Sequence, residues 1–254
     1  MNVLKKILQI IYSIYCISVF LVLMFVLAPF IFLSFVFPEK LRGNIIYKIA
    51  TLWSDIGMFM WGMWHNNIYQ APYDSKKPVI FVFNHISYLD IPILLKSFRH
   101  QPVRVLGKAE IGTIPIFGQI YKSAAITVKR SDAEDRAKSV DRLRAVIKDN
   151  ISIALAPEGT FNMSDKPLKD FYDGAFRLAI ETGTPVRPVI FLDAFDRLHY
   201  DSIFSFTPGK SRAVFLENVD ASAYSMEQIG ELKQKVYTIM EKALINHNAS
   251  WIKL

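Results

Sequence analysis

Cysteine is the scarcest residue in this sequence. The single one, Cys16, lies in an apolar stretch near the N-terminus. One cysteine excludes an intrachain disulfide and a zinc site built from several cysteines. The sequence also lacks a Gly-x-Ser-x-Gly pattern and any cluster of its histidines. Neither a serine-nucleophile hydrolase nor a histidine-rich metal centre therefore has a signature here.

Charge is missing from one long segment. Between Ile7 and Phe37 there is no Asp, Glu, Lys, Arg or His. As one helix this segment would be about 46 Å long, whereas the hydrocarbon core of a bilayer is about 30 Å thick. We therefore predict a break at Pro29, whose ring clashes with the preceding helical turn. Ile7–Ala28 would then span a membrane, and Phe30–Phe37 would form a second apolar piece.

The flanks of this segment bear on its topology. A cleavable signal peptide fits poorly, because the apolar run is too long and no small-residue cleavage site follows it. Basic residues lie at both ends, namely Lys5, Lys6, Lys40, Arg42 and Lys48. The positive-inside bias therefore cancels, which favours a hairpin with both ends in the cytoplasm.

A second weakly charged stretch, Ile45–Tyr69, contains Trp53, Trp61 and Trp64. Tryptophan is typical of the headgroup level of a bilayer, which is the interpretation we favour; the alternative is a helix packed on the following domain. Residues 1–70 are thus predicted to form a membrane anchor of two or more helices. We expect it to be monotopic, with a single span as the alternative.

Long basic runs are also missing. The chain has 30 Lys and Arg against 23 Asp and Glu, a formal charge of +7, which favours anionic partners. No basic run exceeds two residues, and no aromatic-basic recognition motif is present, so nucleic acid is a poor candidate. An apolar N-terminus beside a mildly basic body indicates a membrane surface instead.

Residues 71–254 alternate between strand-like and helix-like segments. Short apolar runs predict strands at 78–83, 103–106, 125–128, 151–156, 186–192 and 213–216. Helices are expected at 87–98, from 131, at 173–182 and at 225–246. This alternation predicts an α/β domain with a central mixed or mostly parallel sheet flanked by helices.

The first candidate for chemistry is the block from Asn84 to Asp90, where a strand gives way to a helix. Across such a junction the imidazole of His85 can fall back onto a carboxylate in the first helical turn. That pair would make a general base oriented by Asp90. A plain alternative is that Ser87 and Asp90 only cap the helix.

Three later blocks could support this pair. Pro157-Glu158-Gly159-Thr160 follows a strand, so its carboxylate would emerge at the edge where α/β folds place their sites. Gly107-Lys108 and Lys129-Arg130 also follow strands and would supply cations, and Gly183–Val189 enters another strand. Singly, each has a structural alternative: a turn, solvated charge or a rigid loop.

In this order and spacing the blocks resemble the glycerolipid acyltransferase superfamily, and within it the bacterial 1-acyl-glycerol-3-phosphate acyltransferases. Asn84-His85 and Asp90 match its first motif, and Lys108 matches a basic position that follows. Arg130 matches the end of the second motif, Pro157–Thr160 the third and Thr184–Val189 the fourth. The resemblance covers about residues 78–216, and an apolar N-terminal anchor is expected in this family.

The resemblance implies roles. His85 would take the proton of an acceptor hydroxyl, which then attacks the thioester of acyl-CoA or acyl-carrier protein, and Asp90 would orient His85. The remaining members would bind substrate: Asn84, Glu158, Gly159 and Thr160 near the hydroxyls, and Lys108 and Arg130 at a phosphate. No metal and no cofactor is required. The acceptor would be a membrane lipid, and the site would face the cytoplasm at a bacterial inner membrane.

The third motif departs from the family pattern, in which Arg usually follows Thr. Here Phe161 follows Thr160. Arg187, where the family usually has an aliphatic residue, is our candidate to replace the missing cation. Alternatively, the acceptor is a lyso-aminolipid or another lipid without a phosphate. Two rival classes are a membrane-anchored lipid hydrolase or thioesterase and a non-catalytic lipid-binding protein.

Overall fold

The computed structural model describes residues 3–72, 74–114, 117–129 and 131–253. Its centre is a seven-stranded sheet in the order β1-β7-β6-β2-β5-β3-β4. Neighbouring strands run parallel except for β6 and β7, so β1 and β7 oppose the other five. The strands are β1 (Met63–Tyr69), β2 (Ile80–Phe83), β3 (Val103–Lys108), β4 (Ala125–Val128), β5 (Ser152–Leu155), β6 (Val186–Phe191) and β7 (Gly209–Phe215). The predicted mixed, mostly parallel sheet is confirmed.

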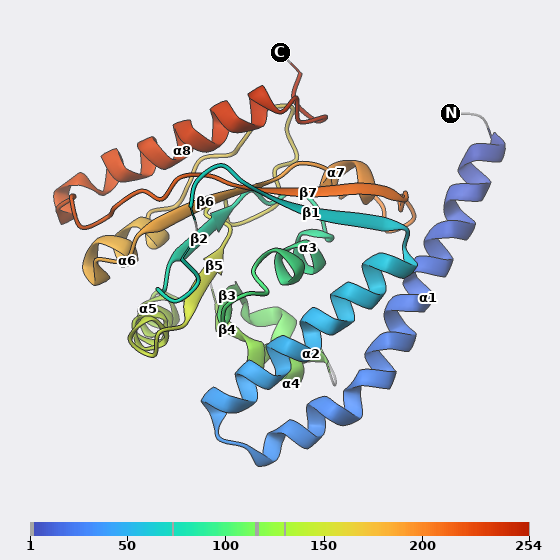
Figure 1. Ribbon diagram of the computed structural model, residues 1–254, viewed down its shortest axis with the longest axis horizontal. Coiled ribbons are helices and arrows are strands. Elements are labelled where there is room, and N and C mark those ends of the chain that lie inside the picture. Colours follow the sequence, from blue (N-terminus) through green and yellow to red (C-terminus); the bar gives the residue numbers. More distant parts are fainter. Residues whose placement is uncertain (1–2, 73, 115–116, 130, 254) are drawn as a thin grey trace.

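Helices cover both faces of this sheet (Figure 1). They are α3 (Asp90–Ser97), α4 (Phe117–Ala124), α5 (Ala133–Lys148), α6 (Gly174–Thr182), the short α7 (Ala194–Arg197) and α8 (Ile229–Asn246). Helices α6 and α8 lie together on one face, and α3 lies on the other. Strands β2, β5 and β6 are buried along their whole length. That burial explains why each appears in the sequence as a short, mostly apolar run, which in β6 is interrupted by Arg187.

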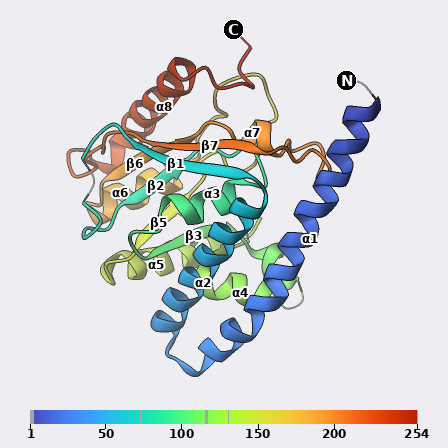
Figure 2. The same cartoon turned by 45° about the vertical axis from the view of Figure 1, so that its right-hand side comes forward.

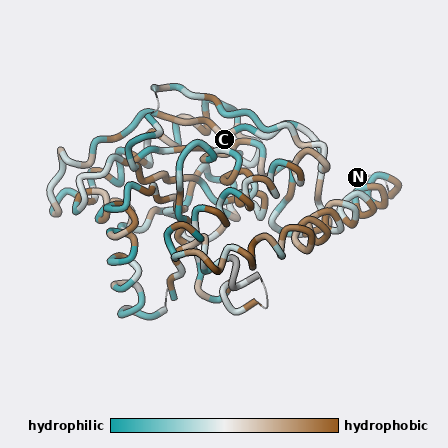
Figure 3. Tube along the Cα trace, turned by 60° about the horizontal axis from the view of Figure 1, so that its bottom comes forward, coloured by the Kyte–Doolittle hydropathy of each residue, from teal (hydrophilic) through white to brown (hydrophobic). Residues whose placement is uncertain are grey.

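The N-terminal residues form a helical hairpin beside the sheet. Helix α1 (Val3–Leu33) passes into a short 3-10 turn (Ser34–Val36), and α2 (Glu39–Met60) returns along it. Figure 3 shows apolar residues along almost all of α1. By length and composition this is the one helix among the described residues that could cross a membrane.

The predicted break at Pro29 is wrong, because Pro29 lies inside α1. The chain turns at Phe37 and Pro38 instead. Phe37 is extended, with φ −93° and ψ 155°, as expected for a residue that precedes proline. Pro38 then caps α2, where its missing N–H costs nothing.

The tryptophans divide between two environments. Trp61 is only 2% exposed, donates to the carbonyl of Cys16 at 3.0 Å and packs edge-on against Trp53. Trp64 is exposed. For Trp61 the structure therefore corrects the headgroup interpretation in favour of packing on the domain. The stretch also ends in strand β1, which the sequence analysis did not expect.

Helix α1 is also tied to the loop between β6 and β7. Gln9 donates to the carbonyl of Ser205 at 3.1 Å, and the buried hydroxyl of Ser13 accepts from the N–H of Phe206 at 3.1 Å. Both views in Figures 1 and 2 show this loop reaching α1. The hairpin and the sheet therefore share a core.

Candidate active site

The turn after β2 begins with Asn84, which is 1% exposed. Its side-chain amide makes two hydrogen bonds to the neighbouring strand β6. Oδ1 accepts from the N–H of Phe191 at 2.8 Å, and Nδ2 donates to the carbonyl of Phe191 at 3.1 Å. This links the end of β2 to the end of β6. Both polar groups of the Asn84 side chain are thus engaged inside the protein, and its contact with substrate stays a prediction.

His85 and Asp90 form the predicted pair. His85 Nδ1 lies 2.7 Å from Asp90 Oδ2, and the same oxygen accepts the backbone N–H groups of Ile86 and Ser87 at 2.8 and 3.0 Å. Asp90 is fully buried, whereas the His85 side chain is 26% exposed. Because the carboxylate accepts the Nδ1 proton, Nε2 is left as the basic nitrogen. Such an arrangement can act as an oriented general base.

The local fold explains this geometry. Helix α3 begins at Asp90, not at Ser87 as predicted, so residues 84–89 form a turn that curls around the carboxylate. Ser87 is not the cap: its hydroxyl donates to the carbonyl of Leu198 at 2.6 Å and accepts from Leu89 N–H. A negative side chain in the first turn of α3 is also favoured by the helix dipole.

Glu158 holds this turn from the neighbouring strand. It is 1% exposed, and its two oxygens accept from the backbone N–H groups of His85 at 2.8 Å and Lys169 at 2.9 Å. Burial raises the pKa of this carboxyl to about 7, although the two N–H donors work in the opposite direction. From this buried position the carboxylate can orient the turn, and its contact with acceptor hydroxyls stays a prediction.

Gly159 and Thr160 follow Glu158 at the rim of the candidate site. Gly159 has φ +73°, a left-handed conformation that favours glycine, and its N–H donates to Ala156. That amide is therefore not free for substrate. Thr160 is exposed and accepts from the ammonium of Lys169 at 2.7 Å. Lys169 is a rim cation that the sequence analysis missed, because it lies in a long irregular loop without a motif.

Phe161 lies directly against the base. Its ring centroid is 4.4 Å from that of His85, at an interplanar angle of 68°. It is also edge-on to Tyr88 at 4.9 Å and 89°. The N–H of Asn162 donates to the carbonyl of His85 at 2.7 Å, which fixes the loop on this side. Three rings therefore meet where the resemblance would place an arginine.

The predicted cations separate. Lys108 ends β3, is exposed, and lies at the same sheet edge as His85. Arg130 lies outside the described residues. Arg187 is fully buried in β6 opposite Phe81, and its guanidinium donates to the carbonyls of Pro72 and Ala71 at 2.9 and 3.0 Å.

Arg187 lies four residues before the end of β6. At ~3.3 Å per residue, this places its backbone about 13 Å from that end of the strand. Its hydrogen bonds to residues 71 and 72 hold the segment that connects β1 and β2. The structure does not bring Arg187 to the site, so its proposed contact with a phosphate is corrected.

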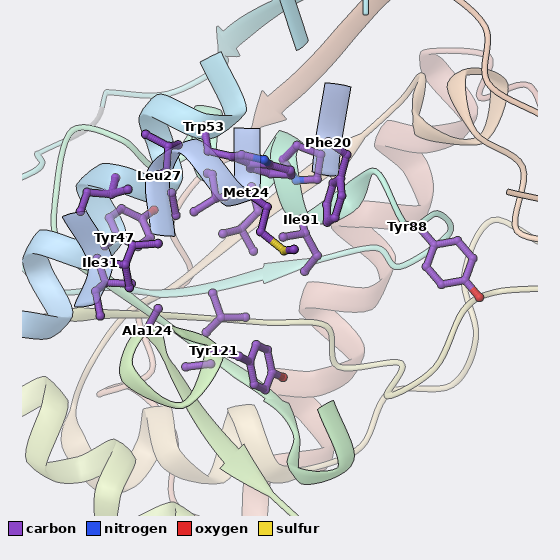
Figure 4. A pocket seen from close by; sticks show the side chains of 18 residues that line it. Phe20, Met24, Leu27, Ile31, Tyr47, Trp53, Tyr88, Ile91, Tyr121 and Ala124 are labelled. Atoms are coloured by element: carbon purple, nitrogen blue, oxygen red, sulfur yellow. The ribbon is translucent and has the colours of Figure 1, made fainter. Parts of the chain in front are cut away.

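An apolar cavity of about 350 Å³ opens beside the turn formed by residues 84–89. Its walls come from α1, α2, α3, β3 and α4, and Figure 4 labels Phe20, Met24, Trp53, Ile91 and Tyr121 among its lining. Tyr88 also lines it and lies apart from the other labelled side chains in Figure 4. Because Tyr88 also touches Phe161, it connects the cavity with the surroundings of His85.

Comparison with known proteins identifies the family of this chain. A family model described as Acyltransferase matches residues 58–192. The 1-acyl-sn-glycerol-3-phosphate acyltransferase of Haemophilus influenzae is 28% identical over 181 residues, which cover 69% of this chain and 73% of that protein. The Escherichia coli protein of the same name is 28% identical over 175 residues, or 67% and 69% of the two chains. A chloroplastic protein of that name from Brassica napus is 30% identical over 152 residues, 59% of this chain and 43% of its own.

A solved structure shares the whole fold. The crystal structure of the 1-acyl-sn-glycerophosphate (LPA) acyltransferase PlsC from Thermotoga maritima matches with a TM-score of 0.74 and 22% identity, over 100% of both chains. The match includes the N-terminal hairpin as well as the sheet.

Proposed function

This chain belongs to the acyltransferase family, and on that premise we propose that it acylates the free hydroxyl of 1-acyl-glycerol-3-phosphate and so makes phosphatidate. The relatives with this activity in their names are O-acyltransferases. The observation that carries the proposal is the pairing of the partly exposed His85 with buried Asp90, beside an apolar cavity.

The reaction follows from the free nitrogen of His85. Nε2 accepts the proton of the acceptor hydroxyl while the hydroxyl oxygen bonds to the carbonyl carbon of the thioester. The tetrahedral intermediate then collapses, the carbon–sulfur bond breaks, and the leaving thiolate takes the proton from the imidazolium. Asp90 holds Nδ1–H throughout and stabilises the cationic ring, as a carboxylate partner does in other general-base sites.

The cavity supports a fatty acyl substrate. Its lining is almost entirely apolar side chains, and α1 and α2 form one of its walls. Each methylene transferred there from water contributes about 0.8 kcal/mol. A long chain lying in the cavity would therefore bring its carboxyl end toward Tyr88 and His85.

Charge at the rim supports a phosphate on the acceptor. Lys108 is exposed at the end of β3, and Lys169 holds its ammonium on Thr160 beside Phe161. Two cations near the base would hold the phosphate of a lysophosphatidate, with Arg130 as the third candidate. The thioester donor is acyl-CoA or acyl-carrier protein, both cytosolic. We therefore place the site at the cytoplasmic face of a bacterial inner membrane, with α1 as the anchor.

The test is a product assay with purified full-length protein in phospholipid vesicles. Lysophosphatidate is offered with acyl-CoA or with acyl-carrier protein, and phosphatidate is measured by mass spectrometry. A lyso-aminolipid acceptor and an acceptor-free reaction run in parallel, with His85→Ala as the blank. Acylation of the aminolipid alone would overturn the phosphate assignment. Fatty acid release without any acylated lipid would overturn the transferase.

A further inference from the structure

A base that activates a lipid hydroxyl can also activate water. In this site Nδ1 of His85 is engaged by Asp90 and the side chain remains 26% exposed. If water reached Nε2, it would lose a proton to His85, its oxygen would bond to the acyl carbon, and the carbon–sulfur bond would break. The thiolate would take the proton, leaving a fatty acid and a thiol. Transfer therefore depends on what covers this nitrogen.

Aromatic rings lie against His85 on the side formed by Phe161 and Tyr88. The Phe161 ring meets the imidazole edge-on at 4.4 Å, and Tyr88 meets Phe161 edge-on at 4.9 Å. Such edge-to-face contacts are the preferred geometry of ring pairs and are worth about 0.5–1.5 kcal/mol beyond burial. Phe161 is only partly exposed, and its ring occupies one side of the imidazole.

The backbone holds Phe161 in that place. On its N-terminal side Glu158 accepts the N–H of His85, and on its C-terminal side Asn162 donates to the carbonyl of His85. Both bonds join the Phe161 loop to the residue it covers. The ring offers no donor or acceptor that could hold a water molecule beside Nε2, unlike the arginine usual at this position in the resembling family.

We propose that Phe161, seated against Tyr88, keeps water from His85 and thereby determines the ratio of acyl transfer to hydrolysis of the acyl donor. The inference rests on the proposed function and assigns it a specificity-determining residue. It also connects the cover with the cavity, because Tyr88 contributes to both. An acyl chain that enters past Tyr88 would then meet the base on a side from which water is excluded.

The experiment measures two rates on the full-length protein in vesicles. Release of CoA from acyl-CoA without acceptor reports hydrolysis, and formation of acylated lipid reports transfer. In Phe161→Ala we expect hydrolysis to rise about tenfold, a loss of roughly 1.4 kcal/mol of discrimination, while transfer persists. Phe161→Leu, which restores part of the apolar cover, should lie between. Met163→Ala is the matched control, because Met163 is an exposed apolar residue of the same loop.

The outcomes separate the two proposals. The double variant His85→Ala with Phe161→Ala must lose the added hydrolysis, because the same base activates the water. If Phe161→Ala loses transfer and gains no hydrolysis while Phe161→Leu behaves like it, the ring is only structural and the inference fails. If the unmodified protein acylates no lipid, the proposed function fails and the inference fails with it. Transfer by the unmodified protein with an unchanged ratio in Phe161→Ala overturns this inference alone.

Discussion

His65 and His85 lie in two regions of one sheet that treat the same side chain differently. His65 is in the middle of edge strand β1, where Nδ1 faces the hydroxyl of Ser211 at 3.0 Å and Nε2 faces Asn67 at 2.8 Å. Burial lowers its pKa to about 4. His85 follows central strand β2 and faces the buried carboxylate of Asp90.

The difference lies in the partners more than in the burial. His65 has neutral hydroxyl and amide neighbours at hydrogen-bond distance. They and the more distant carboxylates do not offset the cost of burying its charge, so it stays neutral above about pH 4. His85 has the carboxylate of Asp90 beside Nδ1. The negative charge of that carboxylate stabilises the imidazolium that general-base catalysis must form. A histidine of this fold has a carboxylate partner where a strand ends beside a helix N-terminus and an aspartate lies in the first helical turn.

The largest expected effect comes from removing the base. His85→Ala should lower acyl transfer by about 10²- to 10⁴-fold, the usual contribution of general-base assistance. Asp90→Asn should lower it strongly as well, because the ring would lose its charged partner. Initial rates in vesicles check this, with thermal melting as the control for folding. Retention of more than about a tenth of the activity in His85→Ala would contradict the mechanism.

A second comparison is between the cationic residues Lys108 and Arg187. Lys108→Ala should raise the apparent KM for lysophosphatidate by about 10- to 100-fold, because a hydrogen bond to a charged group contributes roughly 1.5–3 kcal/mol. The KM for the acyl donor should change much less. A two-substrate kinetic series measures both. Equal changes in the two KM values would remove Lys108 from the phosphate site.

Arg187→Met should do the opposite. It would remove two hydrogen bonds from a charged donor to the carbonyls of Ala71 and Pro72, which contribute roughly 1.5–3 kcal/mol each. We therefore expect a lower free energy of unfolding in denaturant titrations and an unchanged KM for lysophosphatidate in the folded fraction. A selective rise in that KM would return Arg187 to the site.

The smallest effects concern pH. Because burial lowers the folded pKa of His65 from 6.5 to about 4, the unfolded chain binds a proton between these values that the folded chain does not. Stability from His65 is therefore present above about pH 6.5 and lost as pH falls. Between pH 7 and 5 the loss should be about 2 kcal/mol. His65→Gln should remove this part of the acid sensitivity in unfolding curves, with activity at pH 7 retained.

Glu158 should show the reverse slope. Its folded pKa is raised from 4.5 to about 7, so the folded chain binds the extra proton between these values. The unmodified protein should gain about 2 kcal/mol relative to Glu158→Gln as pH falls from 8 to 5. Unfolding curves at both pH values measure the difference. A gain on raising the pH would show that the two N–H donors outweigh burial.

The sequence was informative wherever the interaction is local. The His85–Asp90 pair spans five residues, and the short apolar runs from 78 to 216 became strands within a few residues of their expected bounds. Gly183 ended α6 in a left-handed conformation, as its position predicted. Local chemistry was therefore sufficient for the catalytic pair and most of the sheet.

Long-range partners were not visible. Strand β1 pairs with β7, whose residues lie 146 positions later, and its polar, aromatic composition shows no clean alternation. Arg187 was the candidate for a phosphate contact because it stands where the family usually has an aliphatic residue and an Arg is missing at Phe161. Its partners are main-chain carbonyls, which no side-chain pattern reveals. The cavity likewise depends on how α1 and α2 lie against α3.

Glu158 offers a last consequence, which concerns how such a protein can diversify. Among the described residues, its oxygens accept hydrogen bonds from the main-chain N–H groups of residues 85 and 169 alone, and almost every amino acid supplies such a group. The side chains at Thr160, Phe161 and Lys169 can therefore be exchanged while the link beneath them is kept. Selection can reshape the rim toward a new lipid headgroup, one substitution at a time, without rebuilding the base.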